Sequence, residues 1–430
     1  MKTTWNKWLA GLLGSVIVMG AMVGCNSSSD STNVAAPTPT PTPAPSIHSI
    51  RHVWVLTLEN ENYSTTFAAS SPALYLSQTL PTQGALVQQY YGTGHVSLDN
   101  YIAMISGQAG NTQTNTDCQT FSEFVQTGTD ADGQAIGQGC VYPATIKTLP
   151  DQLKAAGLTW HGYMEDMGND PTRESATCGH PQIGTQDMTQ SPEASGPSAV
   201  NGDQYATRHN PFMYFHSIID SADCATNVTS LAQMENDLKS ISTTANFNFI
   251  TPNLCNDGHD SGCVTGEPGG LISADAFLKK WVPIIMASPA FQQDGLLIIN
   301  FDESSAASGG SPVMTSATTG TLNAVYTGAT CCGQKPGPNL ASYPQTVSMG
   351  SYVTHGITFQ VNITYNNFGG DQTGAVMLSP FIKGGTVSTV GYNHYSLLRS
   401  IEDIFNLGHL GYAGQAGLTS FGSDIINNLH

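Results

Sequence analysis

Three short, almost wholly apolar runs constrain the fold of this chain more than any other feature of its sequence. They are His52–Leu58 (HVWVLTL), Leu296–Phe301 (LLIINF) and Ala375–Leu378 (AVML). Apolar runs of about four to eight residues without alternation are typical of strands buried on both faces, as in a mostly parallel sheet. A further strand is predicted at Phe247–Thr251, after a helical pattern. The sequence therefore predicts an α/β domain.

Helical patterns and long polar stretches separate these strands. We expect helices at Leu98–Ser106, Leu149–Ala156, Ser230–Ser240, Ser273–Ala287 and Ser396–Phe405. The stretches 107–145, 166–205 and 304–350 are rich in Gly, Ser, Thr and Pro. This composition predicts long loops or a cap over the functional site, with some strands of their own. The α/β domain is thus expected to carry large insertions.

Composition excludes two broad classes of protein. Only 10% of the 430 residues are charged, and the net charge is -18. A nucleic-acid groove needs clustered Lys and Arg to meet the phosphate backbone, so we expect no nucleic-acid partner. No apolar run of about 20 residues follows the N-terminal segment, which argues against a polytopic membrane protein. A hydrophobic fraction of 40% suffices for a sizeable core.

The N-terminal segment has the pattern of an export signal. A positively charged end precedes a short apolar stretch, Trp8–Met22, which leads into Gly24-Cys25. This pattern predicts a signal peptide over residues 1–24 and resembles a bacterial lipobox with Cys25 as the lipidated residue. Met22 stands where Leu is usual, and ordinary secretion with cleavage near Gly24 is the alternative.

A tether is predicted after the signal. Residues 25–46 are rich in Ser and Thr and contain alternating Thr-Pro repeats, which favour an extended polyproline II chain. We expect this tether to hold a catalytic domain, residues 47–430, away from a membrane. The predicted location is therefore the bacterial cell envelope, either periplasmic or surface-facing, with the membrane contacted through the N-terminal lipid anchor.

Eight cysteines remain when Cys25 is set aside. An even number in an exported chain suggests disulfides, because export leads to an oxidising compartment. The sequence does not fix the pairing, although close pairs such as Cys255 and Cys263 are plausible. The absence of CxxC…CxxC and HExxH motifs makes a structural zinc site improbable.

Acidic and amide residues follow two of the predicted strands directly. Glu59-Asn60 comes after the first strand, and Asp302-Glu303 comes after the strand at Leu296–Phe301. In open α/β sheets ligands bind outside the carboxyl ends of the strands, so these side chains are aimed at one crevice. Their oxygen atoms are the ligands that hard divalent cations prefer. The alternative is that they are ordinary solvated carboxylates.

Ser97 stands where a helix is expected to begin, in the segment HVSLDNY. Anions gather at helix N-termini because free backbone N–H groups and the helix dipole point there. A serine hydroxyl in that place suits a nucleophile that attacks a phosphate. The alternative is a plain capping serine.

Several histidines are further candidates. Asp257 and His259 lie in the loop NLCNDGHD, where metal binding, protonation of a leaving group and plain loop solvation all remain open. His209 is either a substrate ligand or a turn histidine before an aromatic segment. His394 precedes a helix that Ser396 could cap. The GxSxG elbow, the GxxxxGK[ST] phosphate loop and GxGxxG after a strand are all absent.

Together these motifs resemble the phosphoesterase family that includes bacterial phospholipases C and acid phosphatases, within the alkaline-phosphatase-like superfamily. The resemblance covers residues from about 50 to 410 and rests on the order of its segments rather than on any one of them. The segments are HVWVLTLENENYSTTF, GHVSLDNYIAMISG, LTWHGYMEDM, RHNPFMYF, NFNFITPNLCNDGHD, LLIINFDES, and VMLSPFIKGG followed by YNHYSLLRSIEDIFNL.

The resemblance implies a three-layer α/β/α sandwich with a metal-dependent phosphoesterase site. Carried onto this chain, the implied metal ligands are Glu59, Asn60, Ser97, Asp302 and Glu303, with Asp257 as a candidate for a second ion. The carboxylate at Glu303, where two-metal members of the superfamily have a histidine, favours Ca²⁺, Mg²⁺ or Mn²⁺ over zinc. Whether one or two ions bind is left open.

The resemblance also implies roles in catalysis. Ser97 is expected to attack phosphorus, its hydroxyl made more acidic by a neighbouring metal ion. His259 or His209 is expected to protonate the leaving alcohol. The expected substrate-binding residues are His95, Asn100 and His394.

Three functions remain in competition. The leading one is a phosphomonoesterase of acid-phosphatase type acting on small phosphoesters. The second is a phospholipase C-type phosphodiesterase, against which two departures count: the Gly-rich run Gly369–Gly374 lacks an Arg, and no tryptophan-rich insertion could cage a choline headgroup. The third is a non-catalytic surface lipoprotein on the same scaffold.

Overall fold

The structure is a computed structural model that describes residues 47–428, apart from 260–261, 306–307, 310–311 and 355. The predicted signal peptide, the lipidation site Cys25 and the predicted tether therefore lie outside the described residues. No helix in the described part of the chain is both long and apolar enough to cross a membrane.

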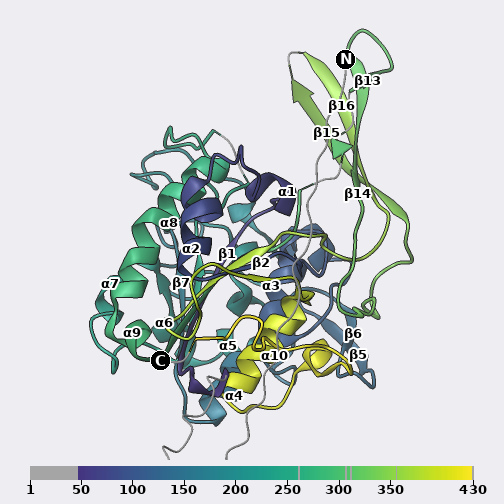
Figure 1. The fold of residues 1–430 in the computed structure, drawn as a ribbon. Helices are drawn as coiled ribbons and strands as arrows, with labels where there is room; N and C mark the ends of the chain where they lie inside the picture. Colours follow the sequence, from purple (N-terminus) through teal and green to yellow (C-terminus); the bar gives the residue numbers. More distant parts are fainter. Residues whose placement is uncertain (1–46, 260–261, 306–307, 310–311, 355, 429–430) are drawn as a thin grey trace, which may run out of the picture. The chain divides into compact units, whose positions relative to one another are not determined.

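An eight-stranded sheet forms the centre of the fold (Figure 1). In spatial order its strands are β18 (Thr386–Ser388), β2 (Ala85–Val87), β17 (Ala375–Leu378), β11 (Gly295–Phe301), β1 (His52–Leu58), β10 (Phe247–Thr251), β7 (Trp160–Met164) and β9 (Val228–Ser230). Every neighbouring pair is parallel except those of β17, which runs antiparallel to both β11 and β2. The predicted α/β class with a mostly parallel sheet is confirmed.

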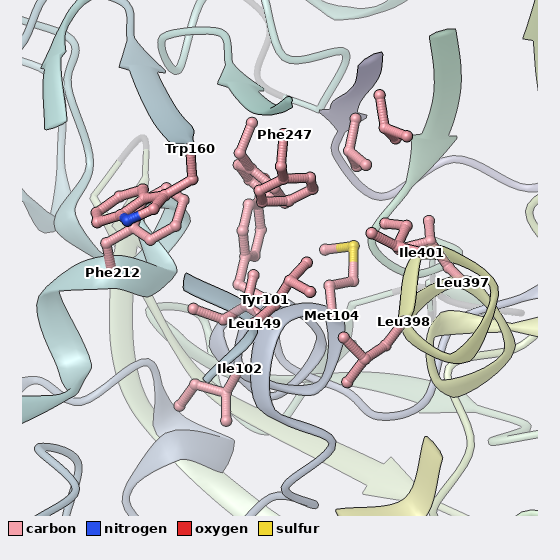
Figure 2. Close-up of a cluster of buried hydrophobic side chains, with 14 of the residues drawn as sticks. Tyr101, Ile102, Met104, Leu149, Trp160, Phe212, Phe247, Leu397, Leu398 and Ile401 are labelled. Carbon is pink, nitrogen blue, oxygen red and sulfur yellow. The ribbon is translucent and has the colours of Figure 1, made fainter. Parts of the chain in front are cut away.

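Helices cover both faces of this sheet, because its strands are apolar on both sides. In β1, Val53 and Val55 join the core beneath α3 (Ser97–Ser106), α4 (Leu149–Ala155) and α10 (His394–Ile404). Trp54 and Leu56 point the opposite way and join the core beneath α2 (Leu80–Gln83), α8 (Gly270–Ala287) and α9 (Pro289–Asp294). Figure 2 shows α3 and α10 side chains meeting on the first face. These are the three layers expected of the fold.

The predicted helix boundaries hold with one exception. The segment predicted as a helix at Ser230–Ser240 begins with the last residue of the edge strand β9, continues as a 3-10 turn at Leu231–Gln233 and is α-helical only in α7 (Met234–Asp237). Pairing of β9 with β7 takes Ser230 out of the helix. The remaining short helices are α1 (Tyr63–Thr66), α5 (His216–Ile219) and α6 (Ala222–Asn227).

The polar insertions contain strands, as expected, whose positions could not be predicted from composition. Strands β14 (Thr319–Tyr326), β16 (Ile357–Tyr365) and β15 (Gln345–Thr354) form a second sheet with the short β12 (Ser308–Gly309) and β13 (Val313–Met314) (Figure 1). Three two-stranded ladders complete the described strands. They pair β3 (Tyr90–Tyr91) with β19 (Tyr392–Asn393), β4 (Thr120–Phe121) with β8 (Thr185–Gln186), and β5 (Val125–Thr129) with β6 (Ala135–Gln138).

All eight cysteines outside the N-terminal segment form disulfides. The pairs are Cys118–Cys140, Cys178–Cys224, Cys255–Cys263 and Cys331–Cys332. The expected close pair Cys255–Cys263 is confirmed, and the other pairings had no signal in the sequence. Cross-links of this kind stabilise a fold mainly by restricting the unfolded chain.

Candidate active site

The acidic strand ends meet at one edge of the central sheet. Strands β1 and β11 are neighbours in register, with Leu58 opposite Phe301, so the residues that follow each strand emerge side by side. Glu59 and Asp302 are fully buried and Glu303 is 2% exposed. The reading of these residues as solvated surface carboxylates is therefore wrong, since all three side chains lie inside the protein.

Asn60 turns the chain sharply after β1. Its φ of 41° lies in the left-handed region, which Asn tolerates better than most residues. This turn lets the Asn60 N–H donate to Asp302 Oδ1 at 3.0 Å. The side-chain amide also faces the carboxylates, and one of its two polar atoms lies 3.2 Å from Glu303 Oε1 and 3.0 Å from Asp302 Oδ1. The other contacts His259 Nδ1 at 3.2 Å.

The buried carboxylates lack a balancing Lys or Arg. Within the described part of the chain, no Lys or Arg forms an ion pair with Glu59, Asp302 or Glu303. Burial, and then the neighbouring charge of Asp302, raises the pKa of Glu59 well above its ordinary value. Burial, and then Glu303, does the same to the pKa of Asp302. A bound cation would relieve both effects, and carboxylate and amide oxygens are the kind of donor that a hard divalent ion prefers.

Ser97 points at this cluster from the first residue of α3. Its hydroxyl donates to Glu59 Oε2 at 2.8 Å, and its side chain is 3% exposed. The expectation of a capping serine is wrong: the cap position is Val96, and no side chain there accepts a hydrogen bond from the helix. Instead Asp117 Oδ1 accepts from the Leu98 N–H at 3.0 Å. The Ser97 hydroxyl therefore does not cap the helix and donates to Glu59 instead.

Tyr101 is a site residue that the motif analysis missed. Its hydroxyl donates to Glu59 Oε1 at 2.6 Å, so the two oxygens of Glu59 are held by two residues of the same helix. Residues four apart lie on one face of an α-helix. The spacing of Ser97 and Tyr101 was therefore the signal that could have found it.

His95 joins two carboxylates. Its Nδ1 lies 2.5 Å from Glu303 Oε2, and its Nε2 lies 3.1 Å from Asp371 Oδ2. Burial alone would lower the pKa of His95, but Glu303 and Asp371 outweigh it and raise that pKa to about 9. Both ring nitrogens are thus occupied by protein groups. Asp371, which the sequence analysis did not single out, also accepts from the N–H groups of Gly328 and Ala329 at 2.8 and 2.7 Å.

Two glycines allow Asp371 to approach. A methyl group on Gly370 would lie 2.6 Å from the Gly92 backbone, and one on Gly92 would lie 2.6 Å from the Asp302 carbonyl oxygen. The Gly-rich run before β17 is therefore a place of close backbone packing. Its acidic residue, Asp371, supports His95.

His209 and His394 lie behind the carboxylates. His209 is 2% exposed, stacks on Tyr101 with ring centroids 5.3 Å apart, and places Nε2 3.4 Å from Glu59 Oε1. His394 is fully buried between the Asp302 carbonyl oxygen, 2.5 Å from Nε2, and the Tyr90 hydroxyl, 3.0 Å from Nδ1. His209 therefore contacts the residue that follows β1, and His394 contacts the backbone of the residue that follows β11.

Asn100 and Asn393 hold backbone rather than substrate in this structure. Asn100 Oδ1 accepts from the N–H groups of Thr93 and Gly94 at 2.8 and 3.0 Å, and its amide donates to the Gly94 carbonyl. It therefore braces the loop before Ser97. Asn393 caps α10 by accepting from the Ser396 N–H at 3.0 Å, so the expected cap at Ser396 is wrong.

The loop after β10 brings Asp257 and His259 to the same edge. The backbone of Asp257 accepts from the Glu59 N–H at 2.8 Å, and its Oδ1 accepts from the His259 N–H at 2.9 Å. Asp257 is 1% exposed, whereas the His259 side chain is exposed. Among the candidate histidines, His259 is thus the one that reaches solvent beside Asn60.

The sequence profile of the Phosphoesterase family matches residues 66–408, about four fifths of the chain. The chain belongs to the Phosphoesterase family. Individual relatives are distant. A phosphate-repressible acid phosphatase of Penicillium chrysogenum is 25% identical over 224 residues, which are 52% of this chain and 42% of the relative. An acid phosphatase of Aspergillus fumigatus is 24% identical over 251 residues, 58% of this chain and 43% of the relative.

A bacterial relative is also found. A phosphatidylinositol-3-phosphatase of Mycobacterium tuberculosis is 22% identical over 252 residues, covering 59% of this chain and 63% of the relative. The match spans less than half the length of the two fungal relatives. Among solved structures, human ectonucleotide pyrophosphatase/phosphodiesterase 5 aligns over 88% of this chain and all of the other, with 10% identity and a TM-score of 0.42.

Proposed function

We propose that this protein hydrolyses phosphoester bonds with Ser97 as the nucleophile, and that it is a phosphomonoesterase of acid-phosphatase type. The observation that carries the proposal is the contact of the Ser97 hydroxyl with the buried acidic cluster, 2.8 Å from Glu59 Oε2. Glu59 in turn lies beside the buried Asp302, and burial and then the charge of Asp302 raise the pKa of Glu59. Membership of the Phosphoesterase family and the names of the acid phosphatase relatives support the same reaction.

The residues that would hold a divalent cation are Glu59, Asn60, Asp302 and Glu303, beside Ser97. Their oxygen donors favour Ca²⁺, Mg²⁺ or Mn²⁺ over zinc. Such an ion would supply positive charge to the phosphoryl oxygens and to the serine oxygen. Asn60 offers a test of this fit: without an ion its amide nitrogen is placed to donate to Asp302 and Glu303, whereas a bound ion would take its amide oxygen. Asp257, with Oδ1 on the His259 backbone, is the candidate for a second ion.

The chain's own residues then perform the transfer. Ser97 Oγ attacks phosphorus as its proton passes to Glu59 Oε2, the bond from phosphorus to the alcohol oxygen breaks, and the alcohol leaves with a proton from His259. Glu59 orients the hydroxyl by accepting its hydrogen bond, and Tyr101 fixes the other oxygen of Glu59 at 2.6 Å. Water next attacks the phosphoserine, which releases phosphate and restores Ser97.

Among the two proposed proton donors, the geometry favours His259. Its side chain is exposed next to Asn60, where a leaving alcohol can reach it. His209 is buried against Tyr101, and burial lowers its pKa well below the ordinary value. We therefore assign His209 to positioning Glu59. On the same grounds His95, Asn100 and His394 position the carboxylates and the Ser97 loop, rather than contact substrate.

The N-terminal pattern supports a location for this activity. We propose that residues 1–24 are removed on export and that Cys25 carries a lipid, so that the Thr/Pro-rich tether holds the catalytic domain at a membrane of the cell envelope. Labelling of the full chain with a radioactive fatty acid in a bacterial host tests this. Cys25→Ser is expected to lose the label, and an unlabelled wild-type chain would contradict the anchor.

The activity is tested by hydrolysis of p-nitrophenyl phosphate and of p-nitrophenyl phosphorylcholine by the full chain. The reactions run from pH 4 to 9, with and without EDTA. The expected result is turnover of the monoester that EDTA removes and that added Mg²⁺, Mn²⁺ or Ca²⁺ restores. Preference for the choline diester would replace the phosphatase by a phospholipase C-type enzyme. Turnover of neither ester with any of these ions would favour a non-catalytic protein.

A further inference from the structure

An open cavity lies beside the acidic cluster and is not explained by the proposed chemistry. Its volume is about 280 Å³. Its lining comes from the start of α1, from the residues after β11 and β14, and from the Gly-rich run. The lining residues are Asn62, Tyr63, Ser64, Tyr91, Ser304, Ser305, Thr327, Ala329, Asp371 and Gln372.

The cavity adjoins the catalytic residues through the chain and through contacts. Ser304 directly follows Glu303, and Asn62 follows the metal-site residue Asn60 by two positions. Asp371 reaches the cluster through His95, whose two nitrogens lie 3.1 Å from Asp371 and 2.5 Å from Glu303. The cavity therefore adjoins the segments that carry Asn60 and Glu303 and the aspartate that holds His95.

The chemistry of the lining is uniform. Most of its side chains end in hydroxyl or amide groups, and it contains no Lys, Arg or His. The one carboxylate, Asp371, already accepts from His95 and from the N–H groups of Gly328 and Ala329. Because His95 also pairs with Glu303, Asp371 keeps part of its negative charge, and the other described lining residues are neutral, with groups that both donate and accept hydrogen bonds.

This surface selects among the alcohols that a phosphoester can release. An anionic alcohol portion, such as a nucleotide with further phosphates, would find no cation there. An acyl chain would displace water from hydroxyl and amide groups without replacing their hydrogen bonds. A ligand with several hydroxyls satisfies such groups, and Tyr63 and Tyr91 add aromatic side chains to the lining. The cavity volume of about 280 Å³ lies just below the usual range of about 300–1,000 Å³ for ligand sites, which favours a small ligand.

We propose that this cavity binds the alcohol part of the substrate, and that this alcohol is a small uncharged polyol of the size of a sugar or a cyclitol. The proposal rests on the proposed phosphoester hydrolysis at Ser97. Two lining residues allow a clean test because both are exposed: Ser64 in α1 and Thr327 after β14. Thr65 is exposed in the same helix but does not line the cavity, so Thr65→Leu is the matched control.

The kinetic arm compares glucose 6-phosphate and inositol 1-phosphate with p-nitrophenyl phosphate, using the full chain. We expect Ser64→Leu and Thr327→Val to lower kcat/KM for the polyol phosphates by roughly tenfold or more, as expected when hydroxyl partners are lost or blocked, and to change p-nitrophenyl phosphate by less than about twofold. Thr65→Leu should leave all three esters unchanged. Equal effects on all esters, or no effect on any, would overturn the proposal.

A binding arm separates this proposal from the proposed function. Saturation-transfer NMR measures contact of free myo-inositol and glucose with the wild-type chain and with Ser64→Leu. Binding that Ser64→Leu abolishes supports the cavity assignment even if no ester is hydrolysed, in which case only the proposed function fails. Turnover of p-nitrophenyl phosphate without polyol binding or polyol preference would leave the phosphatase standing and overturn the cavity assignment. Absence of both would overturn both.

Discussion

The two sides of the acidic cluster are held in different ways. On the Glu303 side, His95 forms ion pairs with both Glu303 and Asp371, so its one positive charge is shared by two carboxylates. On the Glu59 side, the hydrogen-bond donors among the described residues are the neutral hydroxyls of Ser97 and Tyr101. Hydroxyl donors orient a carboxylate but do not cancel its charge. The nucleophile therefore lies on the side where, among the described residues, no Lys or Arg forms an ion pair with the carboxylate; the charge of Arg208, which pairs with Asp117, is the smallest influence on the pKa of Glu59.

This difference indicates that an external cation and a phosphate would act on the Glu59 side. The ion pair with His95 fixes the orientation of Glu303. Outer contacts between a carboxylate and a histidine orient metal ligands in the same way. Burial and then Asp302 raise the pKa of Glu59, burial and then Glu303 raise the pKa of Asp302, and a divalent ion would relieve both effects. Substitutions on the Glu59 side should therefore change chemistry and ion binding, whereas those on the Asp371 side should weaken both without abolishing them.

The largest effect is expected for Ser97→Ala, which removes the nucleophile. Turnover of p-nitrophenyl phosphate should fall by roughly 10⁴-fold or more, as for other enzymes that lose a nucleophilic serine. Ser106→Ala, at the far end of the same helix, removes a hydroxyl that bonds only to backbone groups, and serves as control. Steady-state rates for both variants provide the check. Retention of more than a tenth of the wild-type rate by Ser97→Ala would reject the nucleophile.

Asp302→Asn tests two opposite effects of Asp302 on stability. Its buried charge destabilises the ion-free protein, and its carboxylate is proposed to bind the stabilising ion. Burial and Glu303 raise the pKa of Asp302, so removal of its charge should raise the melting temperature measured in EDTA at pH 7. The same variant should lose the further rise that Mg²⁺, Mn²⁺ or Ca²⁺ gives the wild-type chain, because ligand binding to the folded state stabilises it by mass action. Thermal unfolding with and without ion shows both. An ion-induced shift as large as that of the wild type would exclude Asp302 as a ligand.

On the opposite side, Asp371→Asn is expected to have an intermediate effect. It weakens the hold on His95 and hence on Glu303, and outer contacts of this kind are worth about 10–100-fold in ion affinity or activity. Titration of activity with Mn²⁺ should show a weaker apparent affinity and a reduced maximum. The partly buried Asp132, which pairs with Lys335, provides the control Asp132→Asn. A loss as complete as that of Ser97→Ala would contradict the proposed division of the two sides.

The smallest effect is predicted for a lone buried carboxylate far from the cluster. Burial raises the pKa of Glu402, in α10, to about 8, although the Leu410 N–H donates to it at 2.8 Å. The unfolded chain loses the Glu402 proton near pH 4.5, whereas the folded chain keeps it until about pH 8. The free energy of unfolding therefore falls as the pH rises from about 4.5 toward 8. Glu402→Gln should remove that contribution.

The measurement for Glu402 is thermal unfolding in EDTA at pH 5 and pH 9. The variant should gain stability over the wild type as the pH rises. Adding a divalent ion should shift both proteins equally, because Glu402 has no part in the site. A variant that loses stability relative to the wild type at pH 9 would show that Glu402 is not held protonated by burial.

Much of the fold was predictable because it depends on local patterns. The apolar runs at His52–Leu58 and Leu296–Phe301 identify buried strands wherever they lie in the sheet. The acidic residues after each run then predict a common site, since neighbouring parallel strands end at the same edge. The antiparallel direction of Ala375–Leu378 could not be predicted, because an apolar run gives no indication of strand direction.

The supporting residues of the site were harder to find, because their partners are distant in sequence. Asp371 meets His95 across 276 positions, and His394 meets Asp302 across 92. Histidine next to a turn suggests a ligand, but only the fold shows that both nitrogens of His95 and of His394 face protein groups. Tyr101 differs, since its spacing from Ser97 placed it on the same helix face.

The central claim is that Ser97, set against the acidic cluster, accepts the phosphoryl group. The most direct test is acid quenching of the full chain during turnover of p-nitrophenyl phosphate, followed by mass spectrometry of its peptides. The account predicts one added phosphoryl group on the peptide that contains Ser97, formed only with divalent ion present and absent from Ser97→Ala. A phosphoryl group on a histidine, or turnover with no phosphorylated peptide under conditions that trap the intermediate, would contradict it.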